Sequence, residues 1–222
     1  MRGLPPAGAA CVKRRQDSAP RAAPPLAATG TAVVEVAPLT CARFPDLEAL
    51  FATKGCAFAR GCWCMFYRES GRQSPLPGTT LAELRKARFR ALAAQRPAPG
   101  LLGYDAAGVP IGWVTLGPRD QFTKLARSRV MKPVDAQAVW SIMCFVVAGP
   151  MRGRGVAAAM LVHAVDYART HGAVAVEAYP VDKPARSQPQ WLWHGAKSMF
   201  DRAGFIEVAR RTPERPVMRL SL

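Results

Sequence analysis

The stretch from Val139 to Gly172 constrains the fold more than any other part of the chain. It opens with a nearly unbroken apolar run to Val147, rich in β-branched and aromatic residues, which is typical of a buried strand. Gly149 and Pro150 end that run. The apolar side chains that follow recur mostly every three or four residues, and Gly172 stands where a glycine commonly ends a helix. The stretch therefore predicts a strand, a glycine-rich turn and a long helix.

The turn between the predicted strand and helix has the features of an anion-binding site. The first N–H groups of a helix lack intrahelical partners, and the helix dipole favours negative charge at that end. Gly153 and Gly155 allow a ligand to approach the backbone, while Arg152 and Arg154 bring guanidinium groups suited to phosphate oxygens. The spacing fits neither a P-loop nor a Rossmann motif, which disfavours a nucleoside triphosphate or a dinucleotide. A loop that only connects strand and helix is the alternative.

Two motifs in this part of the chain resemble those of one enzyme family. Residues 152–157, with the sequence RGRGVA, fit the R/Q-x-x-G-x-G/A signature of the GCN5-related N-acetyltransferases, the GNAT superfamily. Residues 199–205, with the sequence MFDRAGF, are similar to the L-Y-E-K-x-G-F element of that family. The resemblance extends over roughly Leu101 to Leu222. It implies an α/β fold with a mixed, mostly antiparallel central sheet flanked by helices.

The resemblance also implies a cosubstrate and a reaction. In the family, the arginine-glycine loop holds the diphosphate of acetyl-CoA, and the strand before it holds the pantetheine. We therefore expect acetyl-CoA as cosubstrate and acetyl transfer to an amine by direct attack in a ternary complex. The residues implied for the pantetheine are Phe145, Val146 and Val147, and those implied for the diphosphate are Arg152, Gly153, Arg154, Gly155, Val156 and Ala157.

The catalytic groups are less well defined by the sequence. Glu177 lies in an apolar segment, where a carboxylate is costly unless it is paired or solvated, so it is a candidate base near Tyr179. A salt-bridged structural Glu177 is an equal alternative, and His194 is a weaker candidate. Many relatives carry a tyrosine where this chain has Phe200, which has no proton to give to the leaving thiolate. Either Tyr179, Ser198 or water then serves as the acid, or the thiolate leaves unassisted.

The remainder of the chain predicts the other elements of a single α/β domain over residues 31–222. The proline- and alanine-rich residues 1–30 are interpreted as a disordered leader. The capping box from Thr80 to Glu83 predicts a helix start. Further strands are expected over residues 31–36, 100–104, 109–116, 173–179, 204–209 and 217–220. Further helices are expected over residues 44–53, from the Thr80 cap to about 95, and over 190–202, and residues 117–133 are expected to form a charged loop that could fold over an acceptor.

A cysteine- and aromatic-rich segment lies at residues 55–67. Its C-x5-C-x-C spacing, formed by Cys56, Cys62 and Cys64 without a nearby histidine, does not match a zinc site, and we expect no metal. The segment is expected to be a core-facing loop or short strand beside the first helix. The alternative is a wall of the acceptor site, because the corresponding segment of the family faces the acceptor. The role of the three thiols stays open.

The net charge of +16 favours polyanionic ligands, of which acetyl-CoA is one and a nucleic acid another. Basic side chains on the helix after Thr80 have few aromatic partners for base stacking, which disfavours a nucleic-acid-binding protein. Acidic residues are few, which disfavours a strongly polycationic acceptor. We expect a small-molecule or peptide amine, and a non-catalytic acyl-CoA-binding module is the alternative motivated by Phe200. No apolar run is long enough to span a membrane, and the N-terminal sequence does not match a secretory signal. We therefore expect a cytoplasmic protein. A homodimer is left open.

Overall fold

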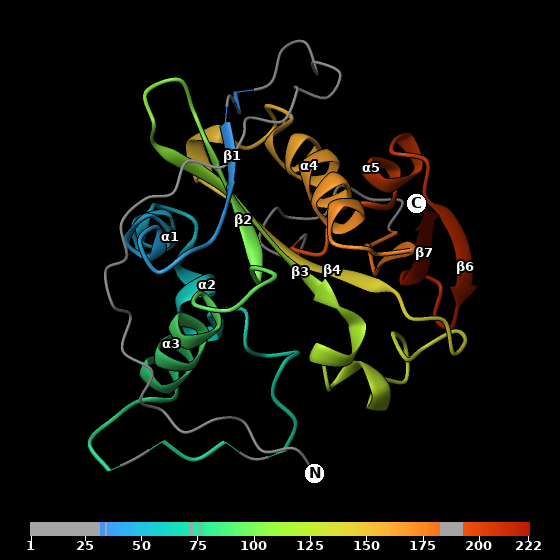
Figure 1. The fold of residues 1–222 in the computed structure, drawn as a ribbon, viewed down its shortest axis with the longest axis horizontal. Helices are drawn as coiled ribbons and strands as arrows, with labels where there is room; N and C mark the ends of the chain where they lie inside the picture. Colours follow the sequence, from blue (N-terminus) through green and yellow to red (C-terminus); the bar gives the residue numbers. More distant parts are fainter. Residues whose placement is uncertain (1–31, 34, 72, 76, 183–192) are drawn as a thin grey trace.

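The chain folds around a seven-stranded sheet with helices on both faces (Figure 1). The computed structural model describes residues 32–33, 35–71, 73–75, 77–182 and 193–222, so the expected leader at residues 1–30 lies outside them. The strand order is β1-β2-β3-β4-β5-β7-β6. Only β4 and β5 pair in parallel, and the other neighbours are antiparallel. The expected mixed, mostly antiparallel α/β sheet is confirmed.

The elements follow one another in an α/β order along the described residues. The strands are β1 Glu35–Pro38, β2 Gly100–Tyr104, β3 Pro110–Pro118, β4 Trp140–Val147, β5 Ala175–Ala178, β6 Ile206–Arg210 and β7 Pro216–Ser221. The helices are α1 Phe44–Ala52, α2 Ala57–Cys62, α3 Leu81–Leu92, α4 Val156–Thr170 and α5 Lys197–Arg202. Short 3-10 turns occur at Arg119–Gln121, Leu125–Arg127 and Gly149–Met151.

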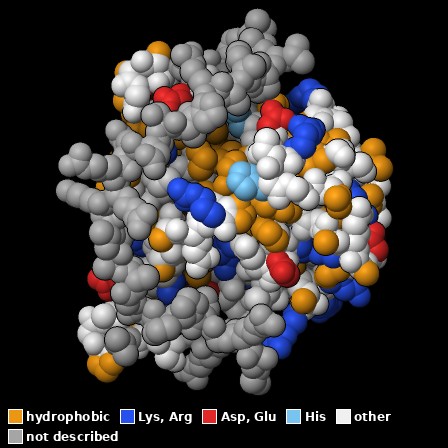
Figure 2. Space-filling model, in the orientation of Figure 1, with side chains coloured by type: hydrophobic (Ala, Val, Ile, Leu, Met, Phe, Trp, Pro, Cys, Tyr) orange, Lys and Arg blue, Asp and Glu red, His pale blue; other side chains and the backbone are white. Residues whose placement is uncertain are grey.

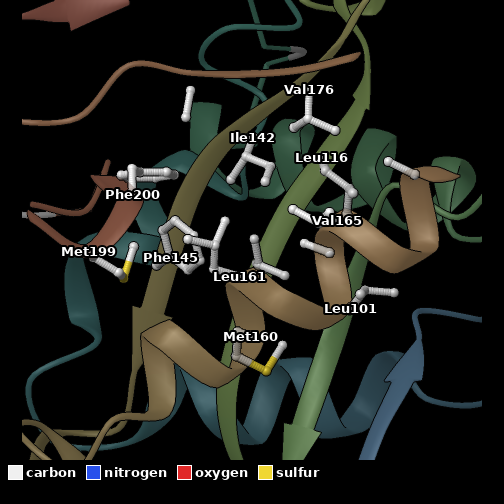
Figure 3. Packing of buried hydrophobic residues seen from close by; sticks show 14 of the residues in the cluster. Leu101, Leu116, Ile142, Phe145, Met160, Leu161, Val165, Val176, Met199 and Phe200 are labelled. Carbon is white, nitrogen blue, oxygen red and sulfur yellow. The ribbon is translucent and has the colours of Figure 1, made fainter. Parts of the chain in front are cut away.

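The long helix α4 covers one face of the sheet. Its buried residues recur every three or four positions, from Val156 through Met160 and Ala164 to Ala168, as the sequence pattern predicts. Figure 3 shows side chains of α4 and α5 pointing toward those of β2, β3, β4 and β5. Phe200 of α5 is completely buried in this layer, with its ring centroid 6.3 Å from that of Phe145. This packing fixes the start of α4 next to the end of β4.

Helices α1, α2 and α3 cover the opposite face of the sheet (Figure 1). Trp63 packs between Phe44 and Phe51 of α1, at centroid distances of 5.9 and 5.2 Å. At the start of α3, the Thr80 side chain accepts from the Glu83 N–H, and the Glu83 carboxylate accepts from the Thr80 N–H. The capping box is therefore confirmed.

Three expected elements differ from the structure. The first strand runs over Glu35–Pro38, where it pairs with β2, rather than over residues 31–36. The segment at 55–67 contains the short helix α2 rather than only a loop or strand. The helix expected at 190–202 begins at Lys197; residues 190–192 are not described, and Gly195 has a φ of +79° that no right-handed helix contains.

Local and long-range contacts explain the two helical corrections. After α2, the chain turns at Trp63 and Cys64, whose φ angles are 46° and 54°. That turn places the Trp63 ring in the core between two rings of α1. Before α5, the chain makes a turn at residues 193–194, and the backbone around Gly195 pairs with Val181: the Val181 N–H donates to the Gly195 carbonyl and the Lys197 N–H donates to the Val181 carbonyl, both at 2.9 Å. Partners distant in the sequence thus override the local helical pattern.

Candidate active site

The strands β4 and β5 pair over only three residues and then separate. Their register joins Trp140 to Val176, Ser141 to Glu177 and Ile142 to Ala178, whereas β4 continues to Val147. The rest of β4 therefore has no β5 partner on that side. The resulting fork between the two strands is the place where a ligand can lie along a strand edge.

Residues 193–197 lie in this fork. The Phe145 N–H donates to the Trp193 carbonyl at 2.6 Å, and Val181, just beyond β5, pairs with the same segment. One backbone amide that the resemblance implies for the pantetheine is therefore bonded to the chain itself. The Val147 carbonyl, by contrast, accepts from Arg152 Nε at 3.3 Å, and the Val146 side chain is buried toward α1.

The loop between β4 and α4 has the open geometry of an anion site. Gly153 has a φ of +77°, and apart from its two neighbours in the chain no heavy atom of the described residues lies within 4 Å of the position that a Cβ would take. Gly155 is the N-cap of α4 with a φ of +75°, and no side chain among the described residues caps this helix. The first backbone N–H groups of α4, those of Val156 and Ala157, are thus without a side-chain acceptor from the N-cap residue.

The two arginines of the loop have different surroundings. The Arg152 guanidinium donates to the Gly55 carbonyl at 2.6 Å as well as to Val147, so it ties the loop to the segment before α2. Arg154 is exposed beside Gly153. The structure thus brings together all the residues implied for the diphosphate, with Arg152 holding the loop and Arg154 directed at solvent.

A β-bulge in β4 turns two successive side chains to the same face. Thr115 pairs with Cys144 and Leu116 pairs with Ile142, so Met143 has no residue opposite it in β3. Ile142 and Phe145 belong to the layer under α4, whereas Met143 and Cys144 face the other side. This bulge could not be predicted from the sequence, because an apolar run has no alternation that an extra residue would interrupt.

A pocket of about 330 Å³ lies over the bulge. The cysteine- and aromatic-rich segment forms one wall, and the sheet and the fork segment form the rest. The lining residues are Phe58, Ala59, Cys62, Cys64, Phe66, Tyr67, Thr115, Met143, Cys144 and Trp193. Sequence reasoning singled out the first wall but missed Thr115, Met143 and Trp193, which come from three separate parts of the chain.

Tyr67 and His194 form a buried polar pair at this pocket. The Tyr67 hydroxyl lies 3.0 Å from His194 Nε2, and His194 Nδ1 has no hydrogen-bond partner among the described residues. Burial holds the pKa of His194 at about 3, with Arg215 acting in the same direction. Burial also raises the pKa of Tyr67 to about 12. Both side chains are consequently uncharged near neutral pH.

Glu177 is paired rather than open to a ligand. Its carboxylate is 1% exposed and accepts from Arg119 at 3.2 Å and from Arg219 at 2.6 Å. The Tyr179 hydroxyl lies 3.2 Å from the same carboxylate and 3.0 Å from Ser141 Oγ, and burial raises the pKa of Tyr179 far above its usual value. These contacts agree with the salt-bridged alternative for Glu177.

The possible proton donors near the leaving group are also located. Phe200, at the position of the family tyrosine, is buried against Phe145 and Phe205. Ser198 is exposed on α5, and Tyr179 is enclosed by its own hydrogen bonds. The structure therefore does not bring Ser198 or Tyr179 to the pocket over the β4 bulge.

The charged loop at 117–133 packs onto the sheet. Phe122 and Leu125 are 1% exposed and contact the cluster that contains Met143 and Tyr179. The Arg119 guanidinium donates to the carbonyls of Asp135 and Gln137, which ties both ends of this region together. A smaller cavity of about 190 Å³ lies between the loop, Tyr67 and Arg215.

The described basic side chains on one face of the molecule do not form a continuous stripe. On the face in Figure 2, Lys and Arg side chains are spread among hydrophobic and uncharged ones. On α3, Arg85 and Arg88 pair with Glu69, Lys86 pairs with Glu48, and Arg90 stacks on Phe44. These contacts partly neutralise the helix that is the best candidate for a nucleic-acid patch.

No group of three or more His, Cys, Asp or Glu side chains in the described ranges is arranged to hold a metal ion. In the same ranges, no helix combines the length and the apolar character needed to cross a bilayer.

Comparison with known proteins points to one family. Residues 63–187 match the model of the acetyltransferase (GNAT) family. An acetyltransferase of the GNAT family from Listeria monocytogenes has a similar structure, with a TM-score of 0.52, 12% identity and coverage of 89% of this chain and 99% of that one. A mosquito arylalkylamine N-acetyltransferase-like 5b has a TM-score of 0.51 and 12% identity, with coverage of 85% of this chain and 99% of that one. Arylalkylamine N-acetyltransferase 2 from Aedes aegypti has a TM-score of 0.50 and 10% identity, with coverage of 84% of this chain and 98% of that one. No curated protein sequence matches the chain. At these identities the structural likeness concerns the fold alone.

Proposed function

Because the chain belongs to the acetyltransferase (GNAT) family, a family of N-acetyltransferases, we propose that it transfers the acetyl group of acetyl-CoA directly to an amine within a ternary complex. The neutral amine nitrogen attacks the thioester carbonyl carbon, the C–S bond breaks, and CoA leaves as the thiolate. The nitrogen gives up one proton, which the thiolate takes up directly or through water, so that the products are the amide and the thiol of CoA. The acceptor amine is the part of this proposal that the family does not specify.

The observation that carries the proposal is the open loop at the start of α4. The diphosphate of acetyl-CoA would lie against the backbone N–H groups from Gly153 to Ala157, which the helix dipole also makes favourable for an anion. The absence of any described atom near the missing Cβ of Gly153 supports a close approach of the phosphates. Arg154, exposed beside it, would add charge-assisted hydrogen bonds.

The pantetheine would follow β4 in the fork, in reach of the backbone of Phe145, Val146 and Val147. The Phe145 N–H is bonded to Trp193 in the structure, so residues near Trp193 have to shift for that amide to contact the cosubstrate. A rearrangement of this kind is common among enzymes that close over a bound substrate. The acetyl carbon would then lie near the β4 bulge.

The loop assignment is tested by two substitutions of Gly153 that differ only in charge. Asn and Asp have nearly the same size, and both tolerate positive φ better than other residues do. Gly153→Asp places a carboxylate where the diphosphate would lie, and we expect its Kd for acetyl-CoA to rise about 10-fold more than that of Gly153→Asn, which corresponds to about 1.4 kcal/mol of repulsion. Isothermal titration calorimetry measures both. Equal Kd values for the two variants would refute the loop assignment.

A further inference from the structure

The pocket over the β4 bulge has an almost entirely apolar lining. The polar side-chain groups of its lining residues are three thiols, the Trp193 indole N–H and the hydroxyls of Tyr67 and Thr115, and the Thr115 hydroxyl already donates to the Pro99 carbonyl at 2.9 Å. None of the described residues that line it carries a charge. A ligand that fills this pocket therefore gains by burying apolar surface and finds few hydrogen-bond partners.

The pocket adjoins the fork, with Trp193 between them. Met143 and Cys144 face it from β4, and Phe145, the next residue, presents its N–H to the fork. Trp193 belongs to both places, because it lines the pocket while its carbonyl accepts from Phe145. A group in the pocket is thus adjacent to the part of β4 where the acetyl carbon would lie.

The charges around the pocket are mostly positive, and Glu69, a carboxylate beside them, is paired with Arg85 and Arg88. The Lys124 ammonium lies 3.5 Å from the centroid of the Phe66 ring. Burial raises the pKa of the Cys62 thiol, and the positive charge of Arg85 acts to lower it. Burial likewise raises the pKa of Tyr67, and the positive charge of Arg215 acts to lower it. These cations disfavour a second ammonium group on the ligand, and no carboxylate lines the described part of the pocket to offset them.

The volume is suited to a ring with a short chain. An apolar protein cavity of about 150 Å³ accommodates benzene, so a pocket of about 330 Å³ has room for an aromatic or branched aliphatic group and the amine that it carries. The rings of Phe58 and Trp193 are stacked at 6.1 Å at one side, and the rings of Phe66 and Tyr67 meet edge-to-face at 4.9 Å. These rings offer faces and edges for aromatic contact.

We infer that the acceptor is a monoamine carried on an apolar or aromatic group, held in this pocket in its uncharged form. The inference rests on the proposed acetyl transfer. The ammonium form gives its proton to water before the nitrogen enters, because the pocket has no carboxylate to stabilise it. The neutral nitrogen is then ready to attack, and the Tyr67 hydroxyl, 3.0 Å from His194 Nε2, can donate a hydrogen bond that orients it.

The test compares three amines: 2-phenylethylamine, ethanolamine and spermidine. Initial rates with acetyl-CoA give kcat/KM for each, and calorimetry with CoA present gives binding without turnover. We expect kcat/KM for 2-phenylethylamine to exceed that for ethanolamine by about 10- to 100-fold, the effect of burying one aromatic group, and spermidine to be the poorest substrate. Cys62→Trp fills the pocket from the end of α2 and should reduce 2-phenylethylamine binding by at least 10-fold, with the KM for acetyl-CoA nearly unchanged.

Two further variants make the result decisive. Phe66→Ala removes a lining ring that is 45% exposed, so folding is not at risk, and it should weaken 2-phenylethylamine binding several-fold. Ile206→Ala removes an exposed apolar side chain on β6, outside the pocket, and should have no effect. Binding that follows this pattern without any acetyl transfer would support the pocket and refute the proposed reaction. Three results would overturn the inference. The first is a preference for spermidine, and the second is unchanged binding of 2-phenylethylamine in both Cys62→Trp and Phe66→Ala. The third is an effect of Cys62→Trp that is confined to longer acyl-CoA donors.

Discussion

Replacing Glu177 by Gln separates a structural carboxylate from a catalytic base. The Glu177 carboxylate is 1% exposed and accepts from Arg119, from two nitrogens of Arg219 and from the Tyr179 hydroxyl. Gln has the same shape but no charge, and its amide NH₂ would face a guanidinium. Because of these contacts, we expect the variant to lose stability and to retain its chemistry.

The size of the loss follows from the contacts that remain. Breaking a buried ion pair from one side costs about 3–5 kcal/mol. Both arginines keep other acceptors, since Arg119 retains the carbonyls of Asp135 and Gln137 and Arg219 retains the Asp135 carboxylate. The lower end, about 3 kcal/mol, is therefore expected. For a chain of this size, that change lowers the Tm by roughly 6–12 °C.

The assay combines calorimetric unfolding with kinetics well below the Tm. Glu207→Gln is the matched control, because Glu207 pairs with Arg210 at the surface, and such exposed pairs contribute little to stability. We expect a large fall in Tm for Glu177→Gln, a small one for the control, and a kcat/KM within about threefold of the wild type for both. An unchanged Tm with a kcat/KM reduced by about 100-fold or more would identify Glu177 as the base and refute the structural assignment.

Two other predictions concern the segment in the fork. His194 has a pKa of about 3 in the folded protein, against about 6.5 in the unfolded chain. Between these two pH values the unfolded chain binds more protons than the folded protein. The free energy of unfolding therefore falls as the pH falls, by at most about 1.4 kcal/mol per pH unit. Urea unfolding at pH 4.5, 5.5 and 7.5 should show a shallower dependence for His194→Gln, and parallel curves would contradict this. Gly195→Ala would place a Cβ 2.7 Å from Met199 Cε. The control is Gly172→Ala, because Gly172 also has a positive φ but has open space around the new Cβ. We expect Gly195→Ala to lower the free energy of unfolding by about 1–3 kcal/mol more than the control does. Thermal unfolding of both variants measures the difference, and equal losses of stability would be inconsistent with the clash.

Much of the fold could be predicted because the relevant signals are local. The apolar run of β4, the glycines of the loop and the periodicity of α4 all lie within one stretch, and the capping box of α3 needs only Thr80 and Glu83. The expected diphosphate residues also lie together for this reason. Neighbouring residues in a strand–loop–helix unit cannot be far apart.

The pocket could not be predicted because its walls meet only after folding. Met143 enters it through a bulge, and Trp193 enters through backbone contacts with Phe145 and Val181. The ion pairs of Glu177 likewise join residues from β5, β7 and the turn after β3. Contacts of this kind depend on which strands become neighbours, and the sequence pattern carries no record of them.

The short junction between β4 and β5 divides the sheet into two unequal parts. Strands β1 to β4 are linked by long antiparallel ladders, and β5, β7 and β6 form a second set, whereas three residue pairs alone join the two sets. Glu177 lies at this seam and binds Arg119 at the end of one set and Arg219 within the other. The carboxylate thus joins the two sets of strands with ion pairs at the place where the ladder between neighbouring strands is shortest.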